Sequence, residues 1–150
     1  RACGPEGMVE GQNRDILSEN KVLTEEELDE IHYLKTGKLI EACVMCVCLI
    51  KKNIDEITIE KLIKFSNKFG LAFQIRDDIL DEIGDETKIG KPIKSDIKNN
   101  KSTYPSIIGI EKSQEKAELL ISEALEILNE LPYKTDKLKF LCELVIKRKN

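Results

Sequence analysis

Residues 58–84 decide the fold, and they read TIEKLIKFSNKFGLAFQIRDDILDEIG. Apolar residues recur along this stretch at helical spacing, and Thr58 stands where the capping residue of a helix would stand. When successive residues are placed 100° apart, four polar side chains fall within one arc of about 100°: Gln74, Asp77, Asp78 and Asp81. The stretch therefore predicts a long helix with one apolar side and one acidic side.

The chain on either side of this stretch also has helical patterning. Thr24 and Glu27 stand at the spacing of a capping box, and apolar residues follow at helical spacing as far as Ile50. Two shorter helices are expected at 112–131 and 136–148, and long loops only at 51–57 and 85–101. Because the alternation typical of strands is missing throughout the sequence, we predict an all-α protein.

The overall composition narrows the possible classes of function. The chain has 150 residues, with 24 Lys and Arg against 28 Asp and Glu, which suits one compact domain. A net charge of −4 with 5% aromatic residues argues against a nucleic-acid binder. The longest apolar run, 42–50, is far shorter than the roughly 20 residues of a membrane span, so we expect no membrane span.

The start of the chain and its cysteines indicate how the chain relates to a longer protein and where in the cell it is located. The chain begins at Arg1 without an initiator Met, so we expect it to be a carboxy-terminal part of a longer protein. No secretory signal peptide is visible, and the five cysteines are an odd number. Since disulfides are rare in the cytosol, reduced thiols and a cytoplasmic location are the simplest interpretation. Cys43, Cys46 and Cys48 lie in an apolar run and are expected to pack in the core.

The acidic side of the 58–84 helix is the first candidate for chemistry. Six acids and no base stand within 77–86. Like charges four residues apart, such as Asp77 and Asp81, destabilise a helix by a few tenths of a kcal/mol. A hard cation would explain the arrangement, because Mg²⁺ binds one or two carboxylates together with waters and substrate phosphates. A solvated acidic face is the alternative, and the pattern alone slightly favours it.

A basic segment follows the acidic cluster. Five lysines stand within 88–101, with only Asp96 opposing them. Basic side chains beside carboxylates are what a site for Mg²⁺ and a phosphate-bearing ligand would need. The segment could equally neutralise the acidic helix without any ligand, and the two interpretations stand level.

Lys35-Thr36-Gly37 interrupts the helical pattern that follows Thr24. Glycine within a helix costs up to about 1 kcal/mol relative to alanine. It is tolerated where a ligand approaches closely or a backbone carbonyl must be freed, and a glycine tolerated for packing carries equal weight. His32, one turn earlier, is interpreted as a packing or surface residue. Gly11, Gln12 and Asp15 carry no chemical signal of their own.

Five short motifs occur in a fixed order along the chain: GMVEGQNRD at 7–15, KTG at 35–37, FQIRDDILD at 73–81, GK at 90–91 and KSTYP at 101–105. Together they resemble the carboxy-terminal half of trans-isoprenyl diphosphate synthases, closest to the bacterial farnesyl (geranyltranstransferase) type. The resemblance covers essentially all of residues 1–150, which would form the carboxy-terminal part of a polyprenyl synthase domain. It implies a helical bundle of the isoprenoid synthase type.

The resemblance also implies a reaction. An allylic diphosphate (dimethylallyl or geranyl) loses its diphosphate with the help of Mg²⁺, and the double bond of isopentenyl diphosphate attacks the resulting cation. Loss of a proton then gives a short-chain product such as farnesyl diphosphate. By the same resemblance, Asp77 would bind Mg²⁺, with Asp78 and Asp81 assisting directly or through water.

The resemblance assigns the remaining site residues as well. Lys35 and Lys101 would hold the allylic diphosphate, with Lys91 at the rim. Thr36, Gln74 and the carbonyl of Lys35 would face the developing cation, so that Lys35, Thr36 and Gln74 form the implied catalytic set. Gln12 and Asp15 would line the wall of the substrate cavity.

The family's first aspartate-rich motif and its isopentenyl-binding bases belong to an amino-terminal half that these residues do not supply. We therefore expect this segment alone to be inactive, and to need that half and a second subunit in a homodimer. Val44, Val47 and Leu49 support this, since they lie off the apolar side formed by Leu28 and Leu34. A geranylgeranyl-type synthase, an isoprenoid cyclase relative, a non-catalytic partner subunit of a synthase and a plain helical interaction module are the alternatives.

Overall fold

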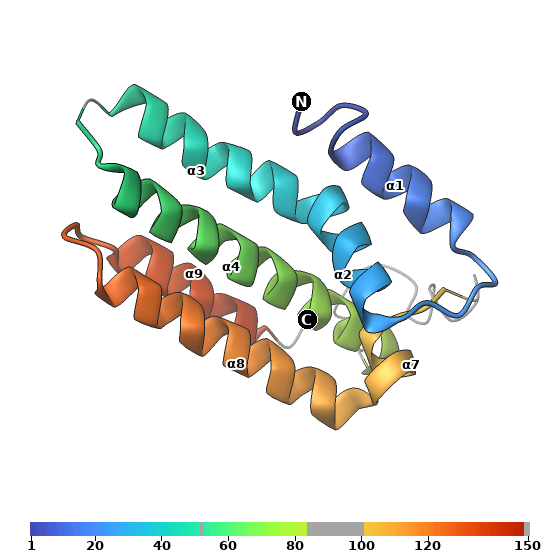
Figure 1. Cartoon of the computed structure of the whole chain (residues 1–150). Helices are drawn as coiled ribbons and strands as arrows, with labels where there is room; N and C mark the ends of the chain where they lie inside the picture. The colour runs from blue at the N-terminus through green and yellow to red at the C-terminus, as the bar shows by residue number, and fades with distance from the viewer. Residues whose placement is uncertain (52, 84–100, 149–150) are drawn as a thin grey trace.

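The computed structural model describes residues 1–51, 53–83 and 101–148. The described chain is helical, in the order α1 (Met8–Leu17), α2 (Glu25–His32), the π-helical turn η1 (Tyr33–Gly37), α3 (Lys38–Ile50), α4 (Glu56–Ile83), α7 (Tyr104–Ile108), α8 (Ile110–Asn129) and α9 (Asp136–Lys147) (Figure 1). No strand occurs within these described ranges, and the all-α prediction is confirmed.

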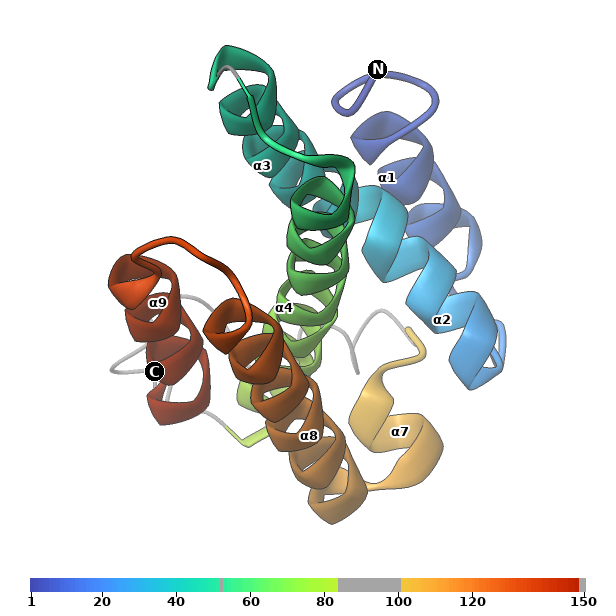
Figure 2. The ribbon, with the colours of Figure 1, turned by 60° about the vertical axis from the view of Figure 1, so that its left-hand side comes forward.

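Helix α4 runs through the middle of the fold. Its 28 residues lie between α3, η1 and α2 on one side and α8 and α9 on the other (Figures 1 and 2). One core cluster joins Phe65 and Ala72 of α4 to residues of α8 and α9. A second joins Ile75 and Ile79 to Tyr104, Leu28 and Ala117. The apolar side predicted for 58–84 is therefore the centre of the core.

Two helix starts show how well local signals located the elements. The capping box at Thr24 is confirmed, because its hydroxyl oxygen accepts from the Glu27 amide at 3.2 Å and its own amide donates to Glu27 at 2.8 Å. The cap predicted at Thr58 is wrong. Asp55 accepts from both the amide and the hydroxyl of Thr58, each at 2.8 Å, so α4 begins at Glu56 and shortens the predicted loop at 51–57.

Among the described residues after α4, one helix was not predicted from the sequence pattern. Thr103 forms a capping box with Ser106, and the short α7 follows. Gly109, at φ +87°, ends α7 and leads into α8, which begins two residues earlier than predicted. Of the predicted loop at 85–101, only Lys101 lies within the described residues. The last predicted helix, 136–148, is confirmed as α9 to within one residue.

Helix α3 exposes much of its apolar surface. Val47, Leu49 and Ile50 are 63%, 79% and 82% exposed, as expected from apolar residues on more than one side of this helix. Core packing is confirmed for Cys48 but wrong for Cys43 and Cys46, because α4 covers only one face of α3. Among the helices described, none is both long and apolar enough to cross a membrane.

Candidate functional site

Two lysines converge on one carboxylate at the contact of α1 with η1. Oδ2 of Asp15, on α1, lies 3.1 Å from the ammonium of Lys35 and 2.6 Å from that of Lys101. Lys35 belongs to η1, and Lys101 lies three residues before α7. The structure thus brings together both lysines of the predicted diphosphate site, and it adds Asp15 as the group that holds them. We call Asp15, Lys35 and Lys101 the lysine cluster.

The backbone of α1 approaches η1 closely enough to form this cluster only because residue 11 is glycine. A β-carbon on Gly11 would lie 2.2 Å from the backbone nitrogen of Lys35 and 2.6 Å from the Lys35 α-carbon. Asp15 lies four residues after Gly11 and therefore projects from the same face of α1. Neither residue carried a chemical signal of its own, and the family resemblance placed Asp15 only in the wall of the substrate cavity. A glycine and an acid one turn apart was the only local hint.

The π-helical turn places the KTG motif at an interruption in a continuous helix. Such turns leave a backbone carbonyl without its usual partner and are frequent at functional sites. The interruption predicted at Lys35-Thr36-Gly37 is confirmed. Gly37 is buried against α4, where a β-carbon on Gly70 would lie 3.3 Å from the Gly37 α-carbon. This close packing sets η1 against the helix that carries the aspartates.

The lysine cluster keeps Asp15 ionised despite its burial. Burial by itself would raise the pKa of the Asp15 carboxyl. The hydrogen bonds and charges of Lys101 and Lys35 outweigh this effect and hold the pKa below its usual value. The cluster is therefore a pre-formed set of two positive charges around one negative charge. Its net positive charge suits an anionic ligand.

The aspartates of α4 do not all face the same neighbours. Asp77 points toward α9, with its carboxylate 3.3 Å from the guanidinium of Arg148. Asp78 points toward α2 and α7, where it accepts from the Tyr104 amide at 3.0 Å and lies 3.3 Å from Nε2 of His32. Asp81 is only 4% exposed. A solvated acidic face is therefore wrong for Asp78 and Asp81, because both side chains are buried.

Arg148 is a residue of this region that the sequence analysis missed. Its carbonyl accepts from the Arg76 guanidinium at 2.7 Å, and its own guanidinium lies 5.5 Å from the centre of the Phe73 ring. These contacts fasten the residue after α9 to the aspartate-bearing part of α4. The only local signal was a basic run at the end of the chain.

The other predicted site residues are spread over the same region. Thr36 is half-buried in η1, Gln74 is buried on α4 at 8% exposure, and Gln12 is exposed on α1. Lys91 lies outside the described residues. His32, interpreted as a packing or surface residue, is buried at 6% exposure and stacks on Tyr104.

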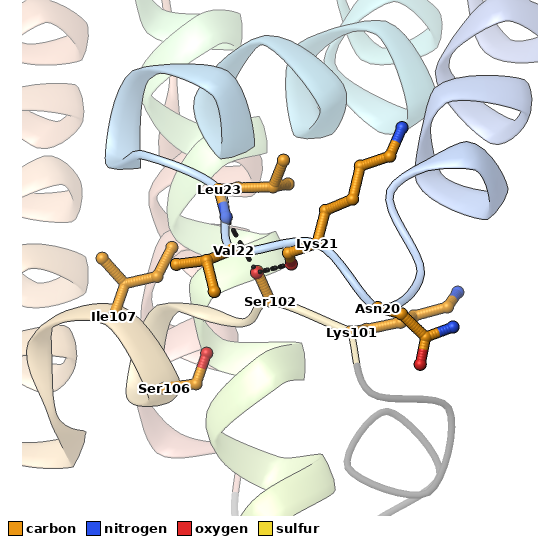
Figure 3. A pocket seen from close by; sticks show the side chains of 8 residues that line it. All are labelled: Asn20, Lys21, Val22, Leu23, Lys101, Ser102, Ser106 and Ile107. Atoms are coloured by element: carbon orange, nitrogen blue, oxygen red, sulfur yellow. Dashed lines mark hydrogen bonds between the residues drawn. The ribbon is translucent and has the colours of Figure 1, made fainter.

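A hollow of about 620 Å³ opens beside Lys101 (Figure 3). It lies between the connection from α1 to α2 and the segment that enters α7, and its lining includes Lys21, Lys101 and Ile107. Ser102 bridges the two walls, donating to the Lys21 carbonyl at 2.9 Å and accepting from the Leu23 amide at 3.1 Å (Figure 3). None of the α4 aspartates lines this hollow, so it is distinct from the acidic part of the site.

The carboxylates of α4 meet the chemical requirement for Mg²⁺, which takes oxygen ligands and completes its shell with water and phosphate. Asp77 and Asp81 lie one turn apart and share a face of the helix. Within the described ranges, however, no group of three or more His, Cys, Asp or Glu side chains stands close enough to hold a metal ion. The described residues by themselves therefore form no complete metal site.

The fold is all-α, and its aspartate-rich helix lies beside a π-helical turn that carries a lysine. This combination points to one family of helical proteins. Residues 5–145 match the family model described as Polyprenyl synthetase. The chain belongs to the polyprenyl synthetase family.

Relatives in sequence carry consistent names. The chain is 45% identical over 147 residues to farnesyl diphosphate synthase of Bacillus subtilis, covering 98% of this chain and 49% of that protein. It is 41% identical over 145 residues to geranylgeranyl diphosphate synthase of Cyanophora paradoxa, covering 96% of this chain and 48% of that protein. The chain therefore spans about half the length of these relatives.

Solved structures agree in fold. A geranyltransferase from Helicobacter pylori, crystallised with magnesium and isoprenyl diphosphate, superimposes with a TM-score of 0.79 at 32% identity, covering 95% of this chain and 46% of that one. Heptaprenyl diphosphate synthase from Staphylococcus aureus has a TM-score of 0.87 at 23% identity, covering 95% and 57% of the two chains, and shows the shared fold. The isoprenoid-synthase type of bundle is confirmed.

Proposed function

We propose that this chain is the carboxy-terminal half of a short-chain isoprenyl diphosphate synthase. The whole protein condenses isopentenyl diphosphate with dimethylallyl or geranyl diphosphate to give a product such as farnesyl diphosphate. The observation that carries this proposal is the convergence of Lys35 and Lys101 on Asp15 in a member of the polyprenyl synthetase family. The names of the Bacillus subtilis and Helicobacter pylori relatives support the same reaction.

The lysine cluster supplies the diphosphate-binding side of this function. Each ammonium group gives one N–H to Asp15, which leaves at most two N–H donors on each lysine for phosphate oxygens, while Asp15 fixes their spacing. Their charge stabilises the diphosphate more strongly as it departs, because negative charge accumulates on it. Lys91 remains proposed for the rim of the same site.

The neighbouring polar groups would act on the other product of ionisation. Thr36 lies in the same π-helical turn as Lys35, and Gln74 is buried on α4, the helix that packs against this turn. Oxygen dipoles fixed before the reaction stabilise a developing positive charge without reorganising during it. Gln12 and Asp15 are proposed for the wall of the cavity.

Mg²⁺ is the proposed cofactor, with Asp77 and Asp81 as its ligands from this chain. When bound, the ion neutralises diphosphate charge and aids its departure. The side chain of Asp77 is 36% exposed, which supports this assignment because a hydrated cation can reach its carboxylate from solvent.

The exposed apolar residues of α3 support the need for further helices. Val47, Leu49 and Ile50 form the kind of surface that usually marks an interaction site. We propose that an amino-terminal half of the same protein and a second subunit cover such surfaces, in a homodimer with reduced thiols in the cytoplasm. The Cyanophora paradoxa relative favours a geranylgeranyl-type synthase as the second candidate.

The test uses the complete natural protein with radiolabelled isopentenyl diphosphate, each allylic diphosphate in turn, and Mg²⁺. Labelled prenyl diphosphate of defined length is the expected product, and Asp77→Asn should lower turnover at least a hundredfold. Chain 1–150 alone should give no turnover. A complete protein that extends neither dimethylallyl nor geranyl diphosphate would overturn the proposal and favour the non-catalytic partner subunit.

A further inference from the structure

We propose that Asp78 is a positioning residue and not a metal ligand. Together with His32 and Tyr104, it fixes the segment that carries Lys101 against α4. This inference deepens the proposed function and rests on it, because it assigns separate roles to adjacent aspartates of one motif.

The contacts of Asp78 point to this role. Its Oδ2 accepts from the backbone amide of Tyr104 at 3.0 Å and lies 3.3 Å from Nε2 of His32. One neighbour is a backbone N–H group and the other a ring nitrogen of the protein, so this oxygen is already directed at α7 and α2. Asp77 and Asp81 share a face of α4, whereas Asp78 lies about 100° around the helix from Asp77. Asp77 and Asp78 therefore point to different neighbours of the helix.

Tyr104 is the residue through which Asp78 acts. Its side chain is fully buried, and the His32 ring stacks on it with ring centres 5.9 Å apart. Its hydroxyl donates to Asp29 of α2, and the ammonium of Lys116, on α8, lies 2.9 Å from that hydroxyl. The first residue of α7 is thus held at its amide by α4 and at its hydroxyl by α2 and α8.

The position of Tyr104 limits where Lys101 can lie. Three residues of chain reach at most about 11 Å, so a fixed Tyr104 amide confines Lys101 to a small volume. Ser102, between them, is held by Lys21 and Leu23. Lys101 can therefore meet Asp15 and Lys35 only while α7 keeps its place on α4.

An amide at position 78 separates the two roles. In Asp78→Asn the side-chain oxygen can still accept from the Tyr104 amide and from His32, so positioning is kept. A metal ligand at this position would need the carboxylate charge, which the amide lacks. Asp78→Ala removes the acceptor altogether, and Asp77→Asn is the matched variant on the proposed metal-binding side.

The experiment measures binding of inorganic pyrophosphate to the complete protein by calorimetry, over a range of Mg²⁺ concentrations. We expect Asp78→Asn to stay within threefold of wild type in pyrophosphate Kd and in half-saturating Mg²⁺. Asp78→Ala should weaken pyrophosphate at saturating Mg²⁺ at least tenfold, with half-saturating Mg²⁺ unchanged. Asp77→Asn should instead raise half-saturating Mg²⁺ at least tenfold. If Asp78→Asn raises the half-saturating Mg²⁺ concentration as much as Asp77→Asn does, Asp78 is a metal ligand and the inference is overturned.

Hydrogen exchange separates failure of this inference from failure of the proposed function. The Tyr104 amide should exchange slowly in wild type and Asp78→Asn, and at least tenfold faster in His32→Ala, which keeps the Asp78 carboxylate but loses its neighbour. This result holds even if wild type binds no pyrophosphate, an outcome that would count against the proposed function alone. Equal exchange rates of the Tyr104 amide in wild type, His32→Ala and Asp78→Ala would overturn the inference. If Asp78→Ala does not fold, the comparison is made between wild type and His32→Ala.

Discussion

Asp15 and Lys101 stand 86 positions apart in the sequence, yet their carboxylate and ammonium meet at 2.6 Å. The contact joins α1 to the segment entering α7, and Lys35 completes it from η1 at 3.1 Å. Three parts of the chain thus depend on one buried carboxylate for the spacing of two positive charges. The stability of this contact can be measured without any substrate.

Asp15→Asn should destabilise the protein by about 2–4 kcal/mol, because it removes the shared anionic partner of two lysines at a largely buried position. Urea unfolding followed by circular dichroism measures the change. Glu143→Gln is the matched control, since Glu143 makes only an exposed pair with Lys147 and should cost about 0.3–0.5 kcal/mol. Equal losses for the two variants would show that the lysine cluster contributes nothing special.

The same residue predicts a dependence of stability on pH. Since the folded protein lowers the pKa of Asp15, the unfolded chain binds its proton first as the pH falls. The contribution of Asp15 is fully present above the ordinary carboxyl pKa of about 3.9 and is lost as the pH falls through the lower folded value. Unfolding free energies of wild type and Asp15→Asn should therefore differ at pH 7 and converge as the pH falls through the lowered pKa of folded Asp15. A constant difference would contradict this.

Gly11→Ala should separate α1 from η1. The new β-carbon would lie 2.2 Å from the backbone nitrogen of Lys35, and the backbone cannot move aside as a flexible side chain can. We therefore expect the free energy of unfolding to fall by about 1–3 kcal/mol or more. Thermal unfolding measures this loss. Gly4→Ala is the control, because its β-carbon would meet only the Arg1 carbonyl at 3.4 Å and should change stability by under about 0.5 kcal/mol.

Arg148→Gln should lower the Mg²⁺ concentration that half-saturates pyrophosphate binding in the complete protein. Its guanidinium stands 3.3 Å from the Asp77 carboxylate and competes there for the same negative charge. Partly exposed pairs contribute up to about 1 kcal/mol, so the shift should reach at most about fivefold. A higher Mg²⁺ requirement in the variant would show instead that Arg148 supports the site.

Cysteine labelling tests the packing of α9. Burial raises the pKa of Cys142 to about 11, so at pH 8 only about one thiol in a thousand would be ionised. We expect Cys142 to react with iodoacetamide only after urea unfolding, and the exposed Cys3 to react at once in the folded protein. Peptide mass mapping distinguishes the two, and rapid labelling of Cys142 in native buffer would contradict the packing.

Local sequence sufficed for the elements whose signals act within one or two turns. The box at Thr24, the helix around Asp77 and the helix over 136–148 follow from contacts between residues three or four apart, which any chain with these residues would make. The KTG interruption was visible for the same reason, since glycine disfavours a helix wherever it stands. The family resemblance rested on short motifs of this kind.

Tertiary structure alone decided which side chains of those elements meet. Asp55 displaced Thr58 as the cap, and α7 formed where its single turn gains support from Tyr104 packing on α2, α4 and α8. Asp15 became the centre of the lysine cluster because the close approach of α1 to η1 and the anchored entry to α7 carry three distant segments to one point. Periodicity records the direction of a side chain around its own helix, and it holds no information about the partner that another helix brings there.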